Sequence, residues 1–113
     1  GMDTLDLSQN TALTYLDCSG WIGLFAGTGS ELSSLNISQN TSLTHLICAS
    51  QTLLANVDVS QHTDLIYLNC SQNNISSLDV SQNSVLTHFL CSNNNLTSLV
   101  GLSLLLNILI NFC

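Results

Sequence analysis

Thiols, imidazoles and carboxylates recur at regular intervals in this sequence, and each can in principle bind a metal ion or act on a substrate. The thiols are the most regular, at Cys18, Cys48, Cys70, Cys91 and Cys113. A zinc site needs ligands that converge on one ion at about 2.3 Å, whereas side chains in one column of a repeat project in parallel. No Cys-x-x-Cys pair is present either. We therefore predict that the first four cysteines are buried, reduced and metal-free, acting as small hydrophobic groups.

The imidazoles and carboxylates also fall short of a catalytic or metal site. His45 and His88 are two repeats apart, roughly 10 Å at the spacing of strands, which is too far to share a metal ion. Asp58 and Asp79 are equivalent in neighbouring repeats and invite a hard cation such as Ca²⁺, but the Gly-Gly-x-Gly-x-Asp loop of calcium-binding solenoids is missing. No Gly-x-Ser-x-Gly or His-Glu-x-x-His motif occurs. We predict no enzymatic activity, no cofactor and no metal site.

The regular spacing arises from an internal repeat of about 21 residues that contains two segments. One segment reads LDLSQN (5–10), LNISQN (35–40), VDVSQH (57–62) and LDVSQN (78–83). The other reads LTYLDC (13–18), LTHLIC (43–48), LIYLNC (65–70) and LTHFLC (86–91). Both alternate apolar and polar residues, which is typical of half-buried strands, and the Asn that follows suits a tight corner. Two extended segments and two corners predict one coil of a solenoid.

The pattern L-x-x-L-x-C-x-x-N-x-L resembles the short repeats of bacterial leucine-rich-repeat proteins. It is complete in LIYLNCSQNNISSL (65–78) and LTHFLCSNNNLTSL (86–99). The resemblance implies a right-handed, mostly β solenoid with little or no helix and about four to five coils, acting as a protein-interaction module. It also implies a cell-surface or secreted location, although the chain shows no signal peptide. We predict a single domain over residues 2–113, with repeats at about 2–31, 32–53, 54–74 and 75–95 and a degenerate end at 96–113; Gly1 is interpreted as an expression scar.

Composition excludes several classes of partner. The chain carries 7 Asp and Glu residues and no Lys or Arg, so its formal net charge is −7 and its pI is about 4.1. Without basic side chains it cannot bind nucleic acid by neutralising phosphates, nor dock on anionic lipids. The apolar fraction of 45% is too high for a disordered acidic tail. The most apolar stretch, residues 99–113, is shorter than the roughly 20 residues of a membrane span.

The outward positions of the cysteine-containing segments are the predicted contact face for a protein partner. They are Tyr15, Asp17, His45, Ile47, Tyr67, Asn69, His88 and Leu90. Such a mixture of aromatic, amphipathic and apolar groups is typical of binding surfaces; the alternative is that the rings only support the sheet. A second candidate is a projecting loop, because residues 21–31 interrupt the period and include Trp21, Ile22, Leu24 and Phe25.

Two other functions stay open, together with a prediction about assembly. The chain can be a truncated fragment of a longer leucine-rich-repeat surface protein with no function of its own. It can also be a solenoid whose Ser, Thr, Asn and Asp side chains bind cations, carbohydrate or ice. The apolar end LVGLSLLLNILINFC (99–113) has no polar cap of the kind that repeat proteins need. We therefore predict a homodimer joined through the C-terminal coil.

Overall fold

The computed structural model describes residues 5–20, 32–51, 53–101 and 109–111. The candidate loop residues Trp21, Ile22, Leu24 and Phe25 lie outside these ranges. The described residues form short strands and no helix. The strands are β1 (Tyr15–Asp17), β2 (His45–Ile47), β3 (Tyr67–Asn69), β4 (Ser77–Asp79), β5 (His88–Leu90), β6 (Ser98–Val100) and β7 (Leu109–Asn111).

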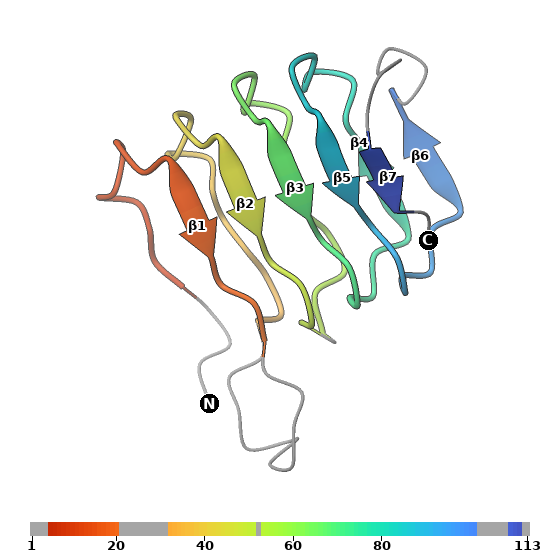
Figure 1. The fold of residues 1–113 in the computed structure, drawn as a ribbon. Helices are drawn as coiled ribbons and strands as arrows, with labels where there is room; N and C mark the ends of the chain where they lie inside the picture. The colour runs from red at the N-terminus through yellow and green to blue at the C-terminus, as the bar shows by residue number, and fades with distance from the viewer. Residues whose placement is uncertain (1–4, 21–31, 52, 102–108, 112–113) are drawn as a thin grey trace.

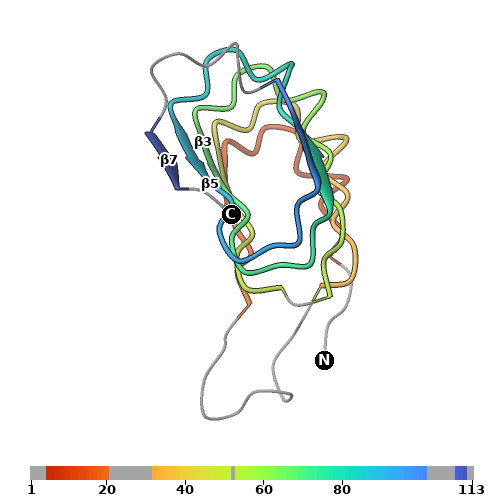
Figure 2. The same cartoon turned by 90° about the vertical axis from the view of Figure 1, so that its right-hand side faces the viewer.

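The strands build two opposite walls of a solenoid (Figures 1 and 2). One wall is a parallel sheet in the order β1-β2-β3-β5-β7, and the other is the parallel pair β4-β6. The register aligns Tyr15 with His45, His45 with Tyr67 and Tyr67 with His88. The predicted columns of equivalent residues, and with them the mostly β solenoid, are therefore confirmed.

The interior between the two walls is filled by the apolar positions of both segments. The second Leu of L-x-x-L-x-C contributes Leu46, Leu68 and Phe89, all fully buried, and the opposite wall contributes Val59 and Val80. Burying one such side chain stabilises the fold by roughly 1.5–3 kcal/mol. Each coil buries its apolar side chains only against the neighbouring coils, so the stability of the fold is distributed over the interfaces between coils.

The second wall is less regular than the repeat predicts. Extended segments were expected in every coil, but residues 5–7, 35–37 and 57–59 form no strand. In the last two coils the Val80 amide donates to the Val100 carbonyl at 2.9 Å. In the earlier coils a side chain does part of this linking instead, since Asn40 Nδ2 donates to the carbonyl of Leu7 at 3.0 Å.

Buried amide side chains connect each coil to the next at both corners. On the cysteine side, Asn73 Nδ2 donates to the carbonyls of Cys48 at 3.0 Å and Cys70 at 2.8 Å, and its Oδ1 accepts the Gln51 amide at 2.7 Å. On the other side, Asn83 Nδ2 donates to the carbonyls of Val59 and His62 at 3.0 and 2.9 Å. Asn73 thereby supplies the partner of the Cys48 carbonyl and of the Gln51 amide. Asn83 adds a second donor to the carbonyls of Val59 and His62, which also accept backbone amides.

Among the described residues, two positions of these corner columns hold a residue other than Asn, and both still link neighbouring coils; Trp21, a third such position, lies outside the described ranges. Gln51 Nε2 donates to the Cys18 carbonyl, and its Oε1 accepts the Leu32 amide at 2.6 Å. His62 is buried, and its Nε2 lies 2.9 Å from the carbonyl of Ile37. Since a carbonyl only accepts, the Nε2 of His62 carries the proton. The longer side chains thus replace Asn while keeping the contact between coils.

Candidate functional site

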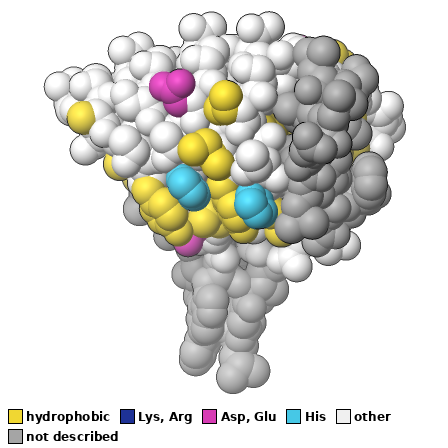
Figure 3. All heavy atoms as spheres, turned by 45° about the horizontal axis from the view of Figure 1, so that its top comes forward, with side chains coloured by type: hydrophobic (Ala, Val, Ile, Leu, Met, Phe, Trp, Pro, Cys, Tyr) yellow, Lys and Arg dark blue, Asp and Glu magenta, His cyan; other side chains and the backbone are white. Residues whose placement is uncertain are grey.

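Four aromatic side chains stack along the outer face of the five-stranded sheet. We call Tyr15, His45, Tyr67 and His88 the aromatic strip. Neighbouring ring centroids are 5.7, 5.9 and 5.6 Å apart, with interplanar angles of 27°, 15° and 24°. The parallel register produces this arrangement, because it places each ring directly beside its equivalent in the next coil. Figure 3 shows the histidine side chains of this face beside hydrophobic ones.

The stacking decides which parts of the rings a partner can reach. The faces of His45 and Tyr67 are each covered by a ring on both sides, so these two residues present their edges and polar tips to solvent. Tyr15 belongs to the end strand of the sheet, and among the described residues only His45 stacks on it. Its side chain is 56% exposed. The strip is therefore a ridge of ring edges with one open ring face at its N-terminal end.

In the aromatic strip, a threonine directly before each histidine fixes the orientation of the imidazole ring. Thr44 Oγ1 donates to the Thr14 carbonyl at 3.1 Å and lies 2.9 Å from His45 Nδ1. The hydroxyl has one hydrogen, so Nδ1–H donates to the oxygen and Nε2 is left as an acceptor. Thr87 repeats the arrangement, at 3.3 Å from the Ile66 carbonyl and 3.0 Å from His88 Nδ1. This role of the threonines was not predicted from the sequence, although the Thr-His pairs of LTHLIC and LTHFLC signal it.

A second column beside the strip carries Asp17, Ile47, Asn69 and Leu90. Asp17 is exposed, while the other three are partly buried. Asp17 Oδ1 and Asn69 Oδ1 each accept the backbone amide two residues later, from Ser19 and Ser71, at 3.1 Å. The eight residues of the predicted contact face therefore lie on one surface, in two adjacent columns.

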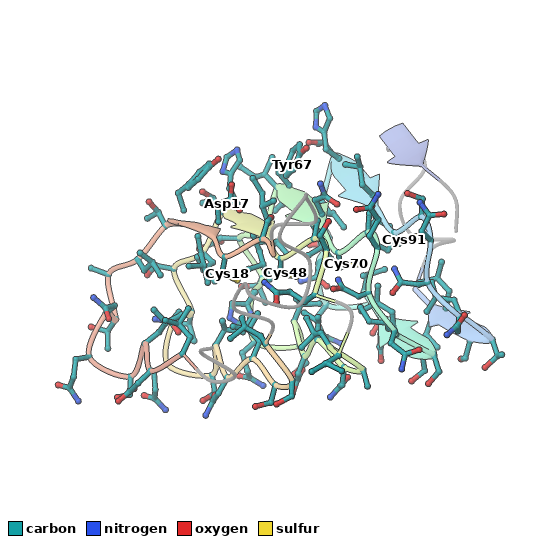
Figure 4. The ribbon with its side chains drawn as sticks, turned by 90° about the horizontal axis from the view of Figure 1, so that it is seen from below. Asp17, Cys18, Cys48, Tyr67, Cys70 and Cys91 are labelled. Atoms are coloured by element: carbon teal, nitrogen blue, oxygen red, sulfur yellow. The ribbon has the colours of Figure 1, made fainter. Side chains whose placement is uncertain are left out.

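The cysteines form a row behind this face, on the opposite side of the strands from Tyr67 (Figure 4). Cys18, Cys48 and Cys70 are free thiols; Cys48 and Cys70 are buried and Cys18 is partly exposed. Burial raises the pKa of Cys70 to about 12. Burial, with a smaller contribution from the Asp17 carboxylate, raises the pKa of Cys18 to about 11. Thiols held neutral in this way are unreactive at neutral pH.

The fourth member of the row corrects one prediction. Cys91 is buried as expected, but it is disulfide-bonded, so the prediction of a reduced thiol is wrong at this position. A reduced Cys91 was predicted because the cysteines of neighbouring coils project in parallel, which disfavours a disulfide between them. Cys48 and Cys70 fit that argument, since both are free and buried, and burial raises the pKa of Cys48 well above its ordinary value.

The carboxylates of the opposite wall are engaged in local turns. In the column of Asp6, Asn36, Asp58 and Asp79, each Oδ1 accepts the amide of the serine two residues later, at 2.8–3.0 Å. Hydrogen bonds from Ser60 and Ser81 lower the pKa of Asp58 and Asp79. Within the described ranges no group of three or more His, Cys, Asp or Glu residues is placed to hold a metal ion. The repeated D-x-S motif is the sequence signal for this turn.

Comparison with known proteins identifies one closely similar fold. No family model and no curated protein sequence matches the chain. Among solved structures, it is similar to the functional domain of InlJ from Listeria monocytogenes, which includes a cysteine ladder. The TM-score is 0.70 at 30% sequence identity, and the match covers 97% of this chain. The chain spans 32% of the length of that solved chain. In the part of the chain described here, no helix is long and apolar enough to cross a membrane.

Proposed function

Because the chain is a leucine-rich-repeat protein of the bacterial type, we propose that it is a non-enzymatic module that binds another protein through its aromatic strip. The observation that carries this proposal is the continuous stack of Tyr15, His45, Tyr67 and His88 on the outer face of the sheet. Aromatic side chains are enriched in protein interfaces and dominate their binding energy.

The strip is also ordered before any partner arrives. Each inner ring is held between two others, and both imidazoles are bonded to a threonine hydroxyl. Side chains that are already fixed lose little conformational freedom on binding, which favours affinity. Ring stacking also supports the sheet, but support alone does not require the partly exposed apolar side chains of Ile47 and Leu90 in the column beside it. The two columns together supply apolar area and hydrogen-bonding tips, as protein interfaces do.

The likeness to InlJ supports two further parts of the proposal. That likeness favours a cell-surface or secreted location, and because the chain spans 32% of the solved InlJ chain, it also favours action as part of a longer protein. Binding of a cation through the opposite wall receives less support, because within the described ranges no group of three or more His, Cys, Asp or Glu residues is placed to hold a metal ion. We place the contact face on the five-stranded sheet for this reason.

Replacing two residues of the aromatic strip by alanine should weaken binding of the natural partner so far that it is no longer retained from an extract. We expect the double variant Tyr67→Ala, His88→Ala to lose about 30-fold or more in affinity, since central aromatic residues contribute about 2 kcal/mol or more to an interface. The matched control is Ser77→Ala, Asp79→Asn on β4, at exposed positions of the opposite wall. Proteins retained from an extract of the native source by the wild type and each variant are compared by mass spectrometry.

We expect a protein that is retained by the wild type and by the β4 control and is lost with the strip variant. Equal retention by the strip variant, or loss only with the β4 control, contradicts the proposal. Thermal unfolding of both variants ensures that neither result arises from a fold defect.

We also propose that the chain forms a homodimer through its C-terminal coil. β7 continues the larger sheet beyond β5, whereas β6 is the last strand of the smaller sheet, with Val100 49% exposed. An open strand edge favours pairing with a second copy about a two-fold axis. Light scattering at micromolar concentration should give the mass of a dimer, and Val100→Lys should return it to a monomer. A monomeric wild type, or a dimer that Val100→Lys leaves intact, would refute this assembly.

A further inference from the structure

The N-terminal end of the aromatic strip differs from the rest because it offers an open ring face. The side chain of Tyr15 is 56% exposed and is stacked on one side by His45. The other side of the ring faces away from β2, because β1 is the end strand of the sheet. The face of a tyrosine ring carries the negative part of its quadrupole and attracts cations. Elsewhere in the strip this face is covered.

A carboxylate lies next to the open ring. Tyr15 and Asp17 are alternate residues of β1, so both point outward on the same face, roughly 7 Å apart along the strand. Asp17 is exposed, and its Oδ1 accepts one hydrogen bond, from the Ser19 amide. A carboxylate can accept about four hydrogen bonds, so most of its capacity is free. The chain has no Lys or Arg to use it.

The rest of the strip adds hydrogen-bond acceptors, and the chain has no Lys or Arg. The Nε2 atoms of His45 and His88 are acceptors, because the neighbouring threonine fixes the proton on Nδ1. The contact face therefore combines a ring face, a carboxylate and two imidazole acceptors, in a protein of net charge −7. Its electrostatic complement is a donor-rich cation. A guanidinium fits better than an ammonium because it is planar, stacks on rings and donates two parallel hydrogen bonds to a carboxylate.

From these observations we infer that Tyr15 and Asp17 form a docking site for an arginine side chain of the protein partner. This inference rests on the proposed function of the strip and deepens it by naming the chemistry of the partner. The guanidinium lies on the open face of Tyr15 and donates to the carboxylate of Asp17, and the apolar part of the partner's segment packs against Ile47.

The test uses the purified chain and a blocked pentapeptide with one central arginine between leucines, titrated while ¹H–¹⁵N NMR spectra are recorded. We expect the amide signals of β1 and β2 to shift. Tyr15→Ala should weaken the affinity about threefold to fivefold, and Asp17→Asn about twofold to fivefold. A twin peptide with citrulline, the neutral isostere of arginine, should bind at least as weakly to the wild type as the arginine peptide binds to the Asp17→Asn variant.

Asp6→Asn is the matched control for Asp17→Asn. Both substitutions remove one unit of negative charge from an exposed aspartate that caps the serine amide two residues later, at 3.0 and 3.1 Å. Asn36 and Asn69 already make the same contact in this chain, so both variants should keep the fold. Binding that weakens with Asp17→Asn and not with Asp6→Asn supports the site.

Equal weakening by Asp6→Asn and Asp17→Asn would show general charge attraction and overturn the arginine site. Equal binding of the arginine and citrulline peptides would overturn it as well. A lysine twin that binds as tightly as the arginine peptide would overturn the specific choice of a guanidinium. None of these results contradicts the proposed function. That function is tested separately, by retention of the natural partner on the wild type and its loss with the Tyr67→Ala, His88→Ala variant.

Discussion

Substituting Asn73 by alanine should lower the free energy of unfolding by about 4 kcal/mol, since each buried polar group left without a partner costs about 1–3 kcal/mol. Asn73 is buried, and its side chain makes three hydrogen bonds, to the carbonyls of Cys48 and Cys70 and from the amide of Gln51. Alanine leaves the Cys48 carbonyl and the Gln51 amide unsatisfied at the boundary between two coils, whereas the Cys70 carbonyl keeps its hydrogen bond from Asn94 Nδ2 at 2.9 Å. Unfolding in urea, followed by circular dichroism, measures the loss.

The adjacent Asn74 is the control for this experiment. It is exposed and receives one hydrogen bond, from Asn95 Nδ2 at 2.6 Å, so Asn74→Ala should cost less than about 1 kcal/mol. Asn73→Asp tests the cause more closely, because it keeps the size and the acceptor for Gln51 but cannot donate to two carbonyls. Similar losses for Asn73→Ala and Asn74→Ala, or full stability of Asn73→Asp, would show that the corner column does not hold the coils together.

The free energy of unfolding should fall steeply as the pH rises from 9 to 11. The pKa of Cys70 is about 12 in the folded chain, and that of Cys48 is raised well above its ordinary value, both because burial disfavours the thiolate. In the unfolded chain a thiol ionises near pH 8.5. Above that pH the unfolded state binds fewer protons than the folded state, so stability falls as pH rises. Such a thiol contributes about 1.4 kcal/mol per pH unit, or roughly 2.5 kcal/mol for Cys70 between pH 9 and 11, and Cys48 adds a loss in the same direction.

Urea unfolding in oxygen-free buffer at several values between pH 8 and 11 measures this slope. Cys18 adds less than the other two, because it is partly exposed and solvent screens its charge. The double variant Cys48→Ala, Cys70→Ala is less stable at pH 7 because it loses packing, but its stability should fall much less steeply above pH 9. An unchanged slope in this variant would mean that groups other than the buried thiols cause the alkaline instability.

The sequence predicts most of the fold because two short motifs repeat with a fixed spacing. Equivalent residues then align, and the columns of Tyr15, His45, Tyr67 and His88 follow from the L-x-x-L-x-C pattern alone. The same argument predicts which face of the sheet is apolar and buried, since alternate residues of a strand point to opposite sides. The eight residues of the predicted contact face lie together for this reason.

The parts that could not be predicted depend on contacts between coils. The pattern does not show that Gln51 replaces Asn in a corner column, because the longer side chain reaches its carbonyl only in the folded stack. Nor does it show that residues 35–37 and 57–59 form no strand, since their alternation matches that of β4. Cys91 forms a disulfide that the equivalent cysteines do not form, so the repeat pattern could not predict it.

The stack of rings was likewise beyond the sequence. Alternating Tyr and His predict a mixed aromatic surface, but not that the rings lie face to face at 5.6–5.9 Å. This geometry determines what the surface can bind, because it covers both faces of His45 and Tyr67 and leaves the outer face of Tyr15 without a stacked ring among the described residues. The arginine site at Tyr15 and Asp17 could therefore be inferred only from the structure.

Site-specific photocrosslinking in the native source tests the central claim, that the aromatic strip is the contact face for a protein partner, most directly. A benzophenone amino acid replaces Tyr67 in one sample, as an aromatic substitute within the strip, and Ser77 of the opposite wall in the other. We predict a discrete crosslinked protein from position 67 and none from position 77. Crosslinking from position 77 alone, or the same protein with equal yield from both positions, would contradict the claim.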